Sequence, residues 1–287
     1  MHEYFTILTT ERRLLTGTME YIKNAVYGML IGIANAIPGV SGGTMAVILD
    51  IYDKIMYSIS LKNIKNNLKF LIPLALGAML GIFALSNVIV QAMENYPVIL
   101  NFCFIGLVLG SIPALYKKAK GDKINSRNWI FFAVALALMV FLTIINPEAT
   151  VNKSIDEFGG VSLWFCLWLF FTAVVSMIAM ILPGLSGSLI FLLLGTYAAV
   201  MESIATFNLI LIFSIGMGVL VGGVLGVKVI KNMLRFHPQA LYFAILGLMV
   251  GSMIIIWPGF SFDLQGAIAV AGLIVFTLAA YMLSSRK

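Results

Sequence analysis

Charged residues are scarce in this sequence. Only 10% of the 287 residues are Asp, Glu, Lys or Arg, whereas soluble domains contain about 25%. The two cysteines, Cys103 and Cys166, both lie in apolar runs, which argues against a disulfide framework or a thiolate metal site. We expect no cofactor, no metal and no nucleic-acid partner. Hydrophobic residues reach 61% and the mean hydropathy is +1.04, so the composition predicts an all-α polytopic membrane protein.

Long apolar runs identify the candidate spans, because a membrane-crossing helix needs about 20 apolar residues. Six runs approach or reach this length: 70–92, 98–116, 128–146, 208–230, 239–257 and 265–283. Two further apolar regions are interrupted by a Pro-Gly pair: 24–59 at Pro38-Gly39, and 161–204 at Pro183-Gly184. Proline ends a helix and glycine permits a sharp turn, so both regions are predicted to be broken helical hairpins.

Basic residues gather in the loops on one side of these spans. If 17 of the 18 Lys and Arg residues are cytoplasmic, the six spans alternate without conflict, provided that each broken region enters and leaves on one side. Only Lys153 then lies outside, in the external loop 147–160. Segment 1–23 is expected to be cytoplasmic or interfacial, and both termini are expected to be cytoplasmic. The lysine-rich loops 62–69 and 117–127 also suit anionic lipid headgroups.

The first broken region is too short on its second side to cross a membrane. Between Thr44 and Asp50 the apolar stretch amounts to about 11 Å of helix, less than half of a hydrocarbon core of about 30 Å. This length favours a re-entrant hairpin at 24–59. The first arm of 161–204 is long enough to span, so re-entrance there is inferred only from the likeness of the two regions.

The two halves of the chain resemble each other. A shift of 145 positions places Pro38-Gly39-Val40-Ser41-Gly42-Gly43 on Pro183-Gly184-Leu185-Ser186-Gly187-Ser188. We therefore divide the chain into repeat 1 (24–146) and repeat 2 (161–287), each with one broken hairpin and three spans. Because each half crosses the membrane an odd number of times, the second is expected to be inverted. Inverted repeats with discontinuous helices are typical of transporters.

Glycines four residues apart recur along the predicted spans. This spacing allows close helix approach, so we assign a packing role to the pairs Gly28/Gly32, Gly77/Gly81, Gly106/Gly110, Gly222/Gly226 and Gly247/Gly251.

The paired Pro-Gly-x-Ser-Gly motifs are the candidate binding site. After each break, a second short helix is expected to begin, and its first amide groups have no helical partner. Two such helix starts, brought together by the inverted symmetry, would make an anion site without a cationic side chain. The candidate phosphate-binding residues are Ser41, Gly42, Gly43, Thr44, Ser186, Gly187 and Ser188, and the hairpin-breaking residues are Pro38, Gly39, Pro183 and Gly184. The alternative is that the prolines only kink packed helices and the serines cap locally.

Five residues near the motifs are candidates for coupling or gating: Asn35, Asp50, Asp53, Tyr52 and Tyr197. Ionisable groups at membrane depth are costly and commonly functional, so Asp50 or Asp53 could carry a proton or gate the site. The alternative is an interfacial cap with Lys54 as the nearby partner. Asn35 lies one turn before Pro38 and could hydrogen-bond across the break.

Two stretches of the sequence resemble the motifs of the bacterial polyprenyl-phosphate transporter family. The first motif is matched by residues 32–44, Gly-Ile-Ala-Asn-Ala-Ile-Pro-Gly-Val-Ser-Gly-Gly-Thr, followed by Asp50-Ile-Tyr-Asp-Lys54. The second is matched by residues 183–188 with Gly195-Thr-Tyr197. The resemblance implies a flippase in the bacterial cytoplasmic (inner) membrane that returns undecaprenyl phosphate from the outer to the inner leaflet during cell-wall biogenesis. Two positions depart from the family: Asp50 stands where glycine is usual, and Ala198 replaces an acidic residue.

Two other functions remain open from the residues alone. A transporter or channel for a small anion could use the same helix starts. A membrane phosphatase acting on polyprenyl pyrophosphate could use the same hairpins, although phosphoryl chemistry favours His, Glu or Arg in the site, and no His or Arg falls within the predicted membrane core. We therefore expect a transporter of polyprenyl phosphate rather than an enzyme, with membrane lipids as its surroundings and its protein partners unknown.

Overall fold

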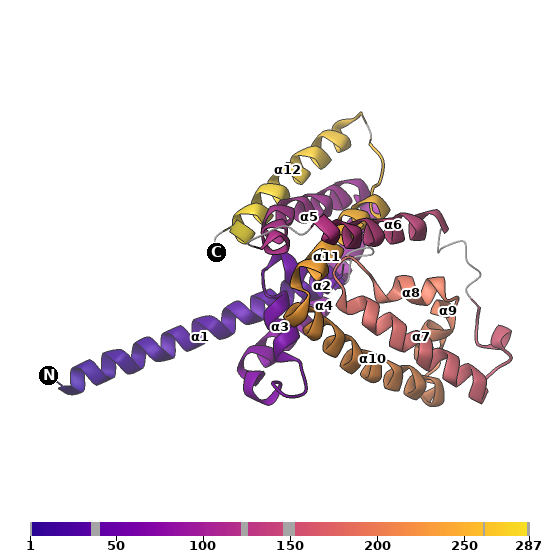
Figure 1. Cartoon of the computed structure of the whole chain (residues 1–287), viewed down its shortest axis with the longest axis horizontal. Coiled ribbons are helices and arrows are strands. Elements are labelled where there is room, and N and C mark those ends of the chain that lie inside the picture. The colour runs from indigo at the N-terminus through magenta and orange to yellow at the C-terminus, as the bar shows by residue number, and fades with distance from the viewer. Residues whose placement is uncertain (1, 36–40, 122–125, 146–152, 261, 286–287) are drawn as a thin grey trace.

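The protein is built from helices, as the computed structural model shows for residues 2–285 except 36–40, 122–125, 146–152 and 261 (Figure 1). No strand occurs among these residues. The helices of the first half are α1 (His2–Asn35), α2 (Gly42–Ile48), α3 (Tyr52–Ser58), α4 (Leu68–Asn95), α5 (Pro97–Lys120) and α6 (Trp129–Ile145). Those of the second half are α7 (Leu163–Ile181), α8 (Gly187–Leu193), α9 (Tyr197–Ala205), α10 (Leu209–Phe236), α11 (Pro238–Ile255) and α12 (Leu264–Ser285).

Six of the described helical segments are long and apolar enough to cross a membrane: Lys65–Phe83, Pro97–Lys120, Leu163–Ile181, Leu209–Phe236, Pro238–Ile255 and Leu264–Ser284. This confirms the predicted class, an all-α polytopic membrane protein. The set differs from the expected spans at two helices. The first arm of the second hairpin, α7, has spanning length, whereas α6 has 17 residues and is a shorter apolar helix. In addition, α1 includes most of the segment 1–23, and its first part extends away from the rest of the molecule (Figure 1).

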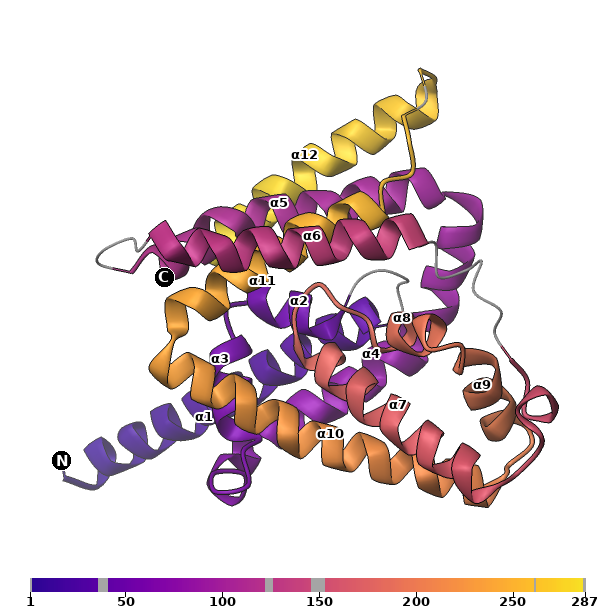
Figure 2. The same ribbon diagram turned by 45° about the vertical axis from the view of Figure 1, so that its right-hand side comes forward.

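Helix packing follows the same pattern in both halves. In the first half α1 packs along α4, and in the second half α7 packs along α10. The remaining long helices pack between the halves: α5 against α12, and α11 against α6, as Figures 1 and 2 show. Exchanging the two halves leaves this set of pairs unchanged, which is what two related repeats produce. The inverted relation of the repeats and the boundaries 24–146 and 161–287 remain predictions.

The spaced glycines lie where these helices touch. A Cβ atom on Gly28 would lie 1.9 Å from the carbonyl oxygen of Leu74 in α4, and one on Gly106 would lie 2.5 Å from the carbonyl oxygen of Leu273 in α12. Such distances leave no room for a side chain, so the predicted packing role is confirmed at these positions. Small residues on one helix allow the backbone of the other to approach closely.

The two hairpins have matching helix starts after their breaks. Helices α2 and α8 have seven residues each and begin 145 positions apart, as do the starts of α3 and α9 at Tyr52 and Tyr197. Seven residues of helix measure about 10 Å, so neither α2 nor α8 crosses a membrane. The chain then bends by 113° between α8 and α9. In Figure 2, α2 and the segment between α7 and α8 lie near the middle of the molecule.

Candidate functional site

The described part of the first motif begins α2, and its residues Ser41 and Gly42 are buried. Ser41 is the N-cap residue: its Oγ accepts a hydrogen bond from the backbone N of Thr44 at 3.2 Å, which satisfies one free amide of the helix start. Asn35, the last residue of α1, accepts a hydrogen bond from the backbone N of Gly42 at 2.8 Å. This is the bond across the break that the sequence predicted for Asn35. The predicted hairpin-breaking residues Pro38 and Gly39 lie outside the described residues.

The second motif begins α8 and is more open. Gly184 has a φ of +90°, which favours glycine, and its neighbour Pro183 is buried. Ser186 precedes α8 but makes no side-chain cap bond, unlike Ser41. Instead the hydroxyls of Ser186 and Ser188 lie 2.6 Å apart, on a part of the motif that is only partly buried.

The two motifs contact each other directly, although they lie about 140 residues apart in the sequence. The backbone N of Gly184 donates to Thr44 Oγ1 at 2.9 Å and to Ser41 Oγ at 3.3 Å. The Tyr52 hydroxyl donates to the carbonyl oxygen of Ile181, the last residue of α7, at 3.2 Å. A Cβ atom on Gly43 would lie 3.3 Å from the same Ile181 oxygen, so the absence of a side chain there permits this approach. These contacts form the hairpin crossing: Ser41, Gly43, Thr44, Tyr52, Ile181 and Gly184.

The crossing differs from the symmetric site that the sequence suggests. Ser41 and Thr44 are 3% and 2% exposed, and their oxygens already accept the Gly184 amide. One of these two hydroxyls also donates to the other, at 3.0 Å. The hydroxyls of Ser186 and Ser188 are the accessible ones. In this conformation the first motif therefore holds the hairpins together, while the hydroxyls of the second motif remain accessible.

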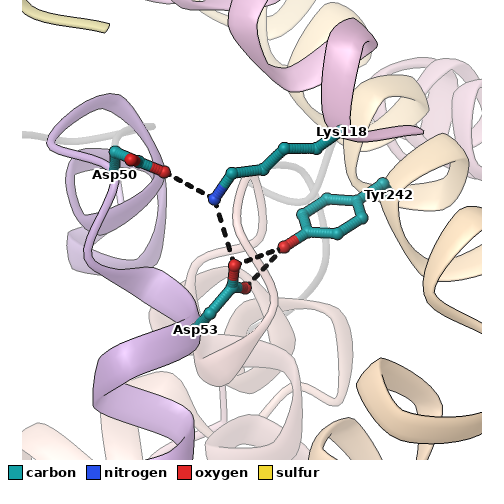
Figure 3. A network of polar contacts seen from close by, with 4 residues as sticks. All are labelled: Asp50, Asp53, Lys118 and Tyr242. Carbon is teal, nitrogen blue, oxygen red and sulfur yellow. Dashed lines mark hydrogen bonds and ion pairs between the residues drawn. The ribbon is translucent and has the colours of Figure 1, made fainter. Parts of the chain in front are cut away.

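Four side chains from three segments form an ionic cluster beside the crossing (Figure 3). Lys118 of α5 pairs with the carboxylate of Asp50, in the corner between α2 and α3, and with Asp53 Oδ2 of α3 at 3.0 Å. The Tyr242 hydroxyl of α11 lies 2.6 Å from both carboxylate oxygens of Asp53 and donates to this group. The cluster therefore ties the first hairpin to α5 and α11.

Sequence reasoning missed Lys118 and Tyr242. The sequence suggested Lys54 as the partner of Asp53, but Lys54 lies 3.7 Å from Glu20 and over the ring of Phe70. The sequence did contain one indication of such a partner: two carboxylates beside an apolar segment require a nearby cation. It could not choose among the cytoplasmic lysines, because the choice depends on how α5 packs against the hairpin.

The other predicted residues make fewer polar contacts. Tyr197 begins α9 as Tyr52 begins α3, but no hydrogen bond of its hydroxyl is present among the described residues. Gly187 lies against α7, where the Ser176 hydroxyl donates to its carbonyl oxygen at 2.7 Å. The described residues contain no group of three or more His, Cys, Asp or Glu side chains that could hold a metal ion.

The long apolar helices and the two broken hairpins that meet between them place this chain in the class of multi-pass helical membrane proteins. The model of the undecaprenyl phosphate translocase-like family matches residues 31–271. The chain therefore belongs to that family.

Two curated relatives agree with this assignment. The chain is 28% identical to a polyprenyl-phosphate transporter of Staphylococcus aureus (strain NCTC 8325 / PS 47), over 82% of this chain and 86% of that protein. It is also 28% identical to a polyprenyl-phosphate transporter of Vibrio cholerae serotype O1 (strain ATCC 39315 / El Tor Inaba N16961), over 84% of this chain and 79% of that protein. No solved structure matches the chain significantly.

Proposed function

We propose that this protein moves a polyprenyl phosphate, undecaprenyl phosphate in particular, from the outer to the inner leaflet of the bacterial cytoplasmic membrane. The family match over residues 31–271 and the two relatives named polyprenyl-phosphate transporter support the substrate. The movement returns the lipid carrier to the side where cell-wall precursors are loaded. The protein acts as a transporter, since translocation requires a path for the headgroup and no bond cleavage.

The headgroup binds at the helix starts beside the hairpin crossing. A phosphate monoester needs hydrogen-bond donors inside the membrane, where unsatisfied polar groups are costly. The second motif supplies two accessible hydroxyls, those of Ser186 and Ser188, and the helix start at Gly187. Ser41, Gly42, Gly43 and Thr44 form the matching set on α2, closed in this conformation by the Gly184 amide.

The contact between Gly184 and Thr44 is the observation that carries this proposal. It brings the two breaks to one point, between helix pairs from both halves. One hydrogen bond contributes only about 1 kcal/mol net, so the crossing can open at modest cost. When it opens, a phosphate oxygen takes the place of the Thr44 hydroxyl as the acceptor for Gly184. Alternating access then needs only a change of partners at the crossing, while the prenyl tail stays in lipid.

The proposed orientation places both termini in the cytoplasm. The start of α1 and the end of α12 lie toward the same side of the molecule in both views, which supports it (Figures 1 and 2). In this scheme Asn35 and Tyr52 act in gating, because Asn35 bonds across the first break and Tyr52 bonds to the opposite hairpin. Asp50 and Asp53 contribute to gating through their ion pairs with Lys118. Tyr197 takes the role of Tyr52 when the crossing rearranges.

The test is leaflet exchange of a labelled polyprenyl phosphate in proteoliposomes. The wild type is compared with a Ser186→Ala/Ser188→Ala double variant. Thr206→Ala serves as the control because its exposed hydroxyl donates to the carbonyl of Glu202 in the preceding turn. We expect exchange by the wild type and by Thr206→Ala, and loss of about tenfold or more in the double variant. Melting temperatures in detergent establish that all three proteins are folded.

Two results would overturn the proposal. Folded wild-type protein that exchanges no polyprenyl phosphate, but takes up labelled inorganic phosphate or chloride, would be a small-anion transporter. Release of inorganic phosphate from a polyprenyl pyrophosphate by the pure protein, without leaflet exchange, would make it a phosphatase.

A further inference from the structure

A pocket of about 440 Å³ lies where α5, α12 and the corner between α2 and α3 meet. Its polar lining consists of Asp50, Lys117, Lys118, Tyr281 and Ser284, and we call it the Lys118 pocket. The volume falls in the range of about 300–1,000 Å³ that is typical of small-ligand sites. The pocket is distinct from the hairpin crossing, because α2, about 10 Å long, separates Ser41 from Asp50.

The lining combines cations with an apolar wall. Lys117 and Lys118 lie on the last turn of α5, and Pro113 and Ala114 form the adjoining apolar surface one turn earlier. Both α5 and α12 are candidate membrane spans, so the pocket lies at the end of two lipid-facing helices. This combination suits a ligand with a charged end and an apolar tail.

We propose that the Lys118 pocket is a second subsite for a phosphate monoester headgroup, which the lipid occupies after it leaves the hairpin crossing. The inference rests on the proposed function and extends it to the side of release. Lys118 and Lys117 meet the phosphate oxygens, and Tyr281 and Ser284 offer hydroxyl donors. The first prenyl units lie along Pro113 and Ala114.

Charge balance explains why such a subsite releases its ligand. The pocket contributes the positive charges of Lys117 and Lys118 and the negative charge of Asp50. Asp53, which pairs with Lys118 beside the pocket, adds a second negative charge, so these four side chains are neutral overall. A phosphate monoester carries a charge of about −1.5 to −2 at pH 7. It must compete with both carboxylates for the Lys118 ammonium, which keeps its affinity low. Passage through a transport path requires binding that is weak enough to reverse.

In this proposal the Asp50 carboxylate weakens phosphate binding in the pocket, which a purely structural ion pair would not do. Removing its carboxylate leaves Lys117, Lys118 and Asp53 with a net positive charge, so phosphate binding becomes tighter. Removing the Lys118 charge leaves Lys117, Asp50 and Asp53 with a net negative charge, so binding becomes weaker. If Asp50 and Lys118 served only to hold the helices together, both changes would loosen the pocket and weaken binding.

The experiment measures binding of geranyl phosphate, a short water-soluble prenyl phosphate, to the purified full-length protein by isothermal titration calorimetry. The Ser186→Ala/Ser188→Ala background removes the accessible hydroxyls of the second motif, which weakens binding beside the crossing, so that the remaining binding reports the Lys118 pocket. In this background we expect Lys118→Gln to weaken binding about fivefold and Asp50→Asn to tighten it about fivefold. Lys120→Gln removes the same charge from the same helix outside the lining, and should change the affinity by less than about twofold.

Several outcomes would overturn the subsite while the transport function stands. These are a complete loss of geranyl phosphate binding in the Ser186→Ala/Ser188→Ala background, equal effects of Lys118→Gln and Lys120→Gln, or weaker binding in Asp50→Asn. If inorganic phosphate bound as tightly as geranyl phosphate, the pocket would be a site for free phosphate rather than for a lipid headgroup. Failure of the transport function itself would show as absent leaflet exchange by the wild type.

Discussion

Asp50 and Gly195 occupy the same corner of the two hairpins, and both have a left-handed backbone, with φ angles of 57° and 68°. The surrounding hydrogen bonds match: the N of Asp50 donates to Val47 and that of Gly195 to Leu192, each three residues earlier. The corner thus requires positive φ in both repeats. Glycine meets that requirement without strain, whereas an aspartate there carries a backbone cost of about 1–2 kcal/mol. The first hairpin accepts this cost where it gains the ion pair with Lys118.

The first prediction concerns this backbone requirement. Gly195→Ala should destabilise the protein by about 1–2 kcal/mol, because alanine disfavours positive φ, whereas Gly195→Asn should cost less because asparagine tolerates it. At the matching corner, Asp50→Gly should be more stable than Asp50→Ala by about 1 kcal/mol, since both lack the carboxylate and only glycine relieves the strain. Melting temperatures in detergent measure all four. Equal melting temperatures for Asp50→Gly and Asp50→Ala would contradict the strain at this corner.

The second prediction concerns the hairpin crossing. Thr44→Val keeps the shape of the side chain and removes the acceptor nearest to the Gly184 amide, leaving Ser41 Oγ at 3.3 Å. A buried donor with a poor partner costs about 1–3 kcal/mol, so the melting temperature should fall.

Thr172→Val is its matched control. Thr172 is also fully buried, but its hydroxyl donates to the carbonyl of Leu169 within its own helix. The loss of this bond should cost less than about 0.5 kcal/mol, because the carbonyl can keep its helical partner. A Thr44→Val protein as stable as Thr172→Val would mean that the crossing contact contributes nothing to stability.

Much of the fold follows from local sequence. The short helices that begin after Ser41 and Ser186 arise from backbone chemistry that each segment carries by itself. The spaced glycines indicate which helix faces can be approached closely, although not which helix does so. The repeat register of 145 also appears in the structure, since α2 and α8 have equal lengths in that register.

The contacts within the site required tertiary information. The bond from Gly184 to Thr44 depends on how the two hairpins cross, and the pairing of Lys118 with Asp50 joins residues that no periodicity connects. Nor did the repeat predict the asymmetry of the two motifs. Ser41 and Ser186 hold matching positions in the repeat, yet only Ser41 caps its helix. The Ser186 hydroxyl instead lies 2.6 Å from that of Ser188, which stands where the first motif has Gly43.

The third prediction separates the two symmetric tyrosines. Tyr52 is 2% exposed, and its hydroxyl satisfies the carbonyl of Ile181 at the end of α7, where the helix supplies no donor. Tyr52→Phe should therefore lower the stability by about 1 kcal/mol. Tyr197→Phe should leave the melting temperature unchanged, because no hydrogen bond of the Tyr197 hydroxyl is found in the described part of the chain. A larger loss in Tyr197→Phe than in Tyr52→Phe would show that another conformation, in which the roles are exchanged, dominates in solution.

The fourth prediction uses two glycines of α10 that lie two residues apart on different faces. A Cβ atom on Gly218 would lie 2.4 Å from the carbonyl oxygen of Phe170 in α7, whereas one on Gly216 would meet nothing within 4 Å. Gly218→Ala should therefore separate α10 from α7 and cost about 1–3 kcal/mol. Gly216→Ala should be neutral or stabilising by up to about 1 kcal/mol, because alanine favours the helix. Melting temperatures of the two variants compare the faces directly, and a Gly218→Ala protein as stable as Gly216→Ala would contradict the close packing of these helices.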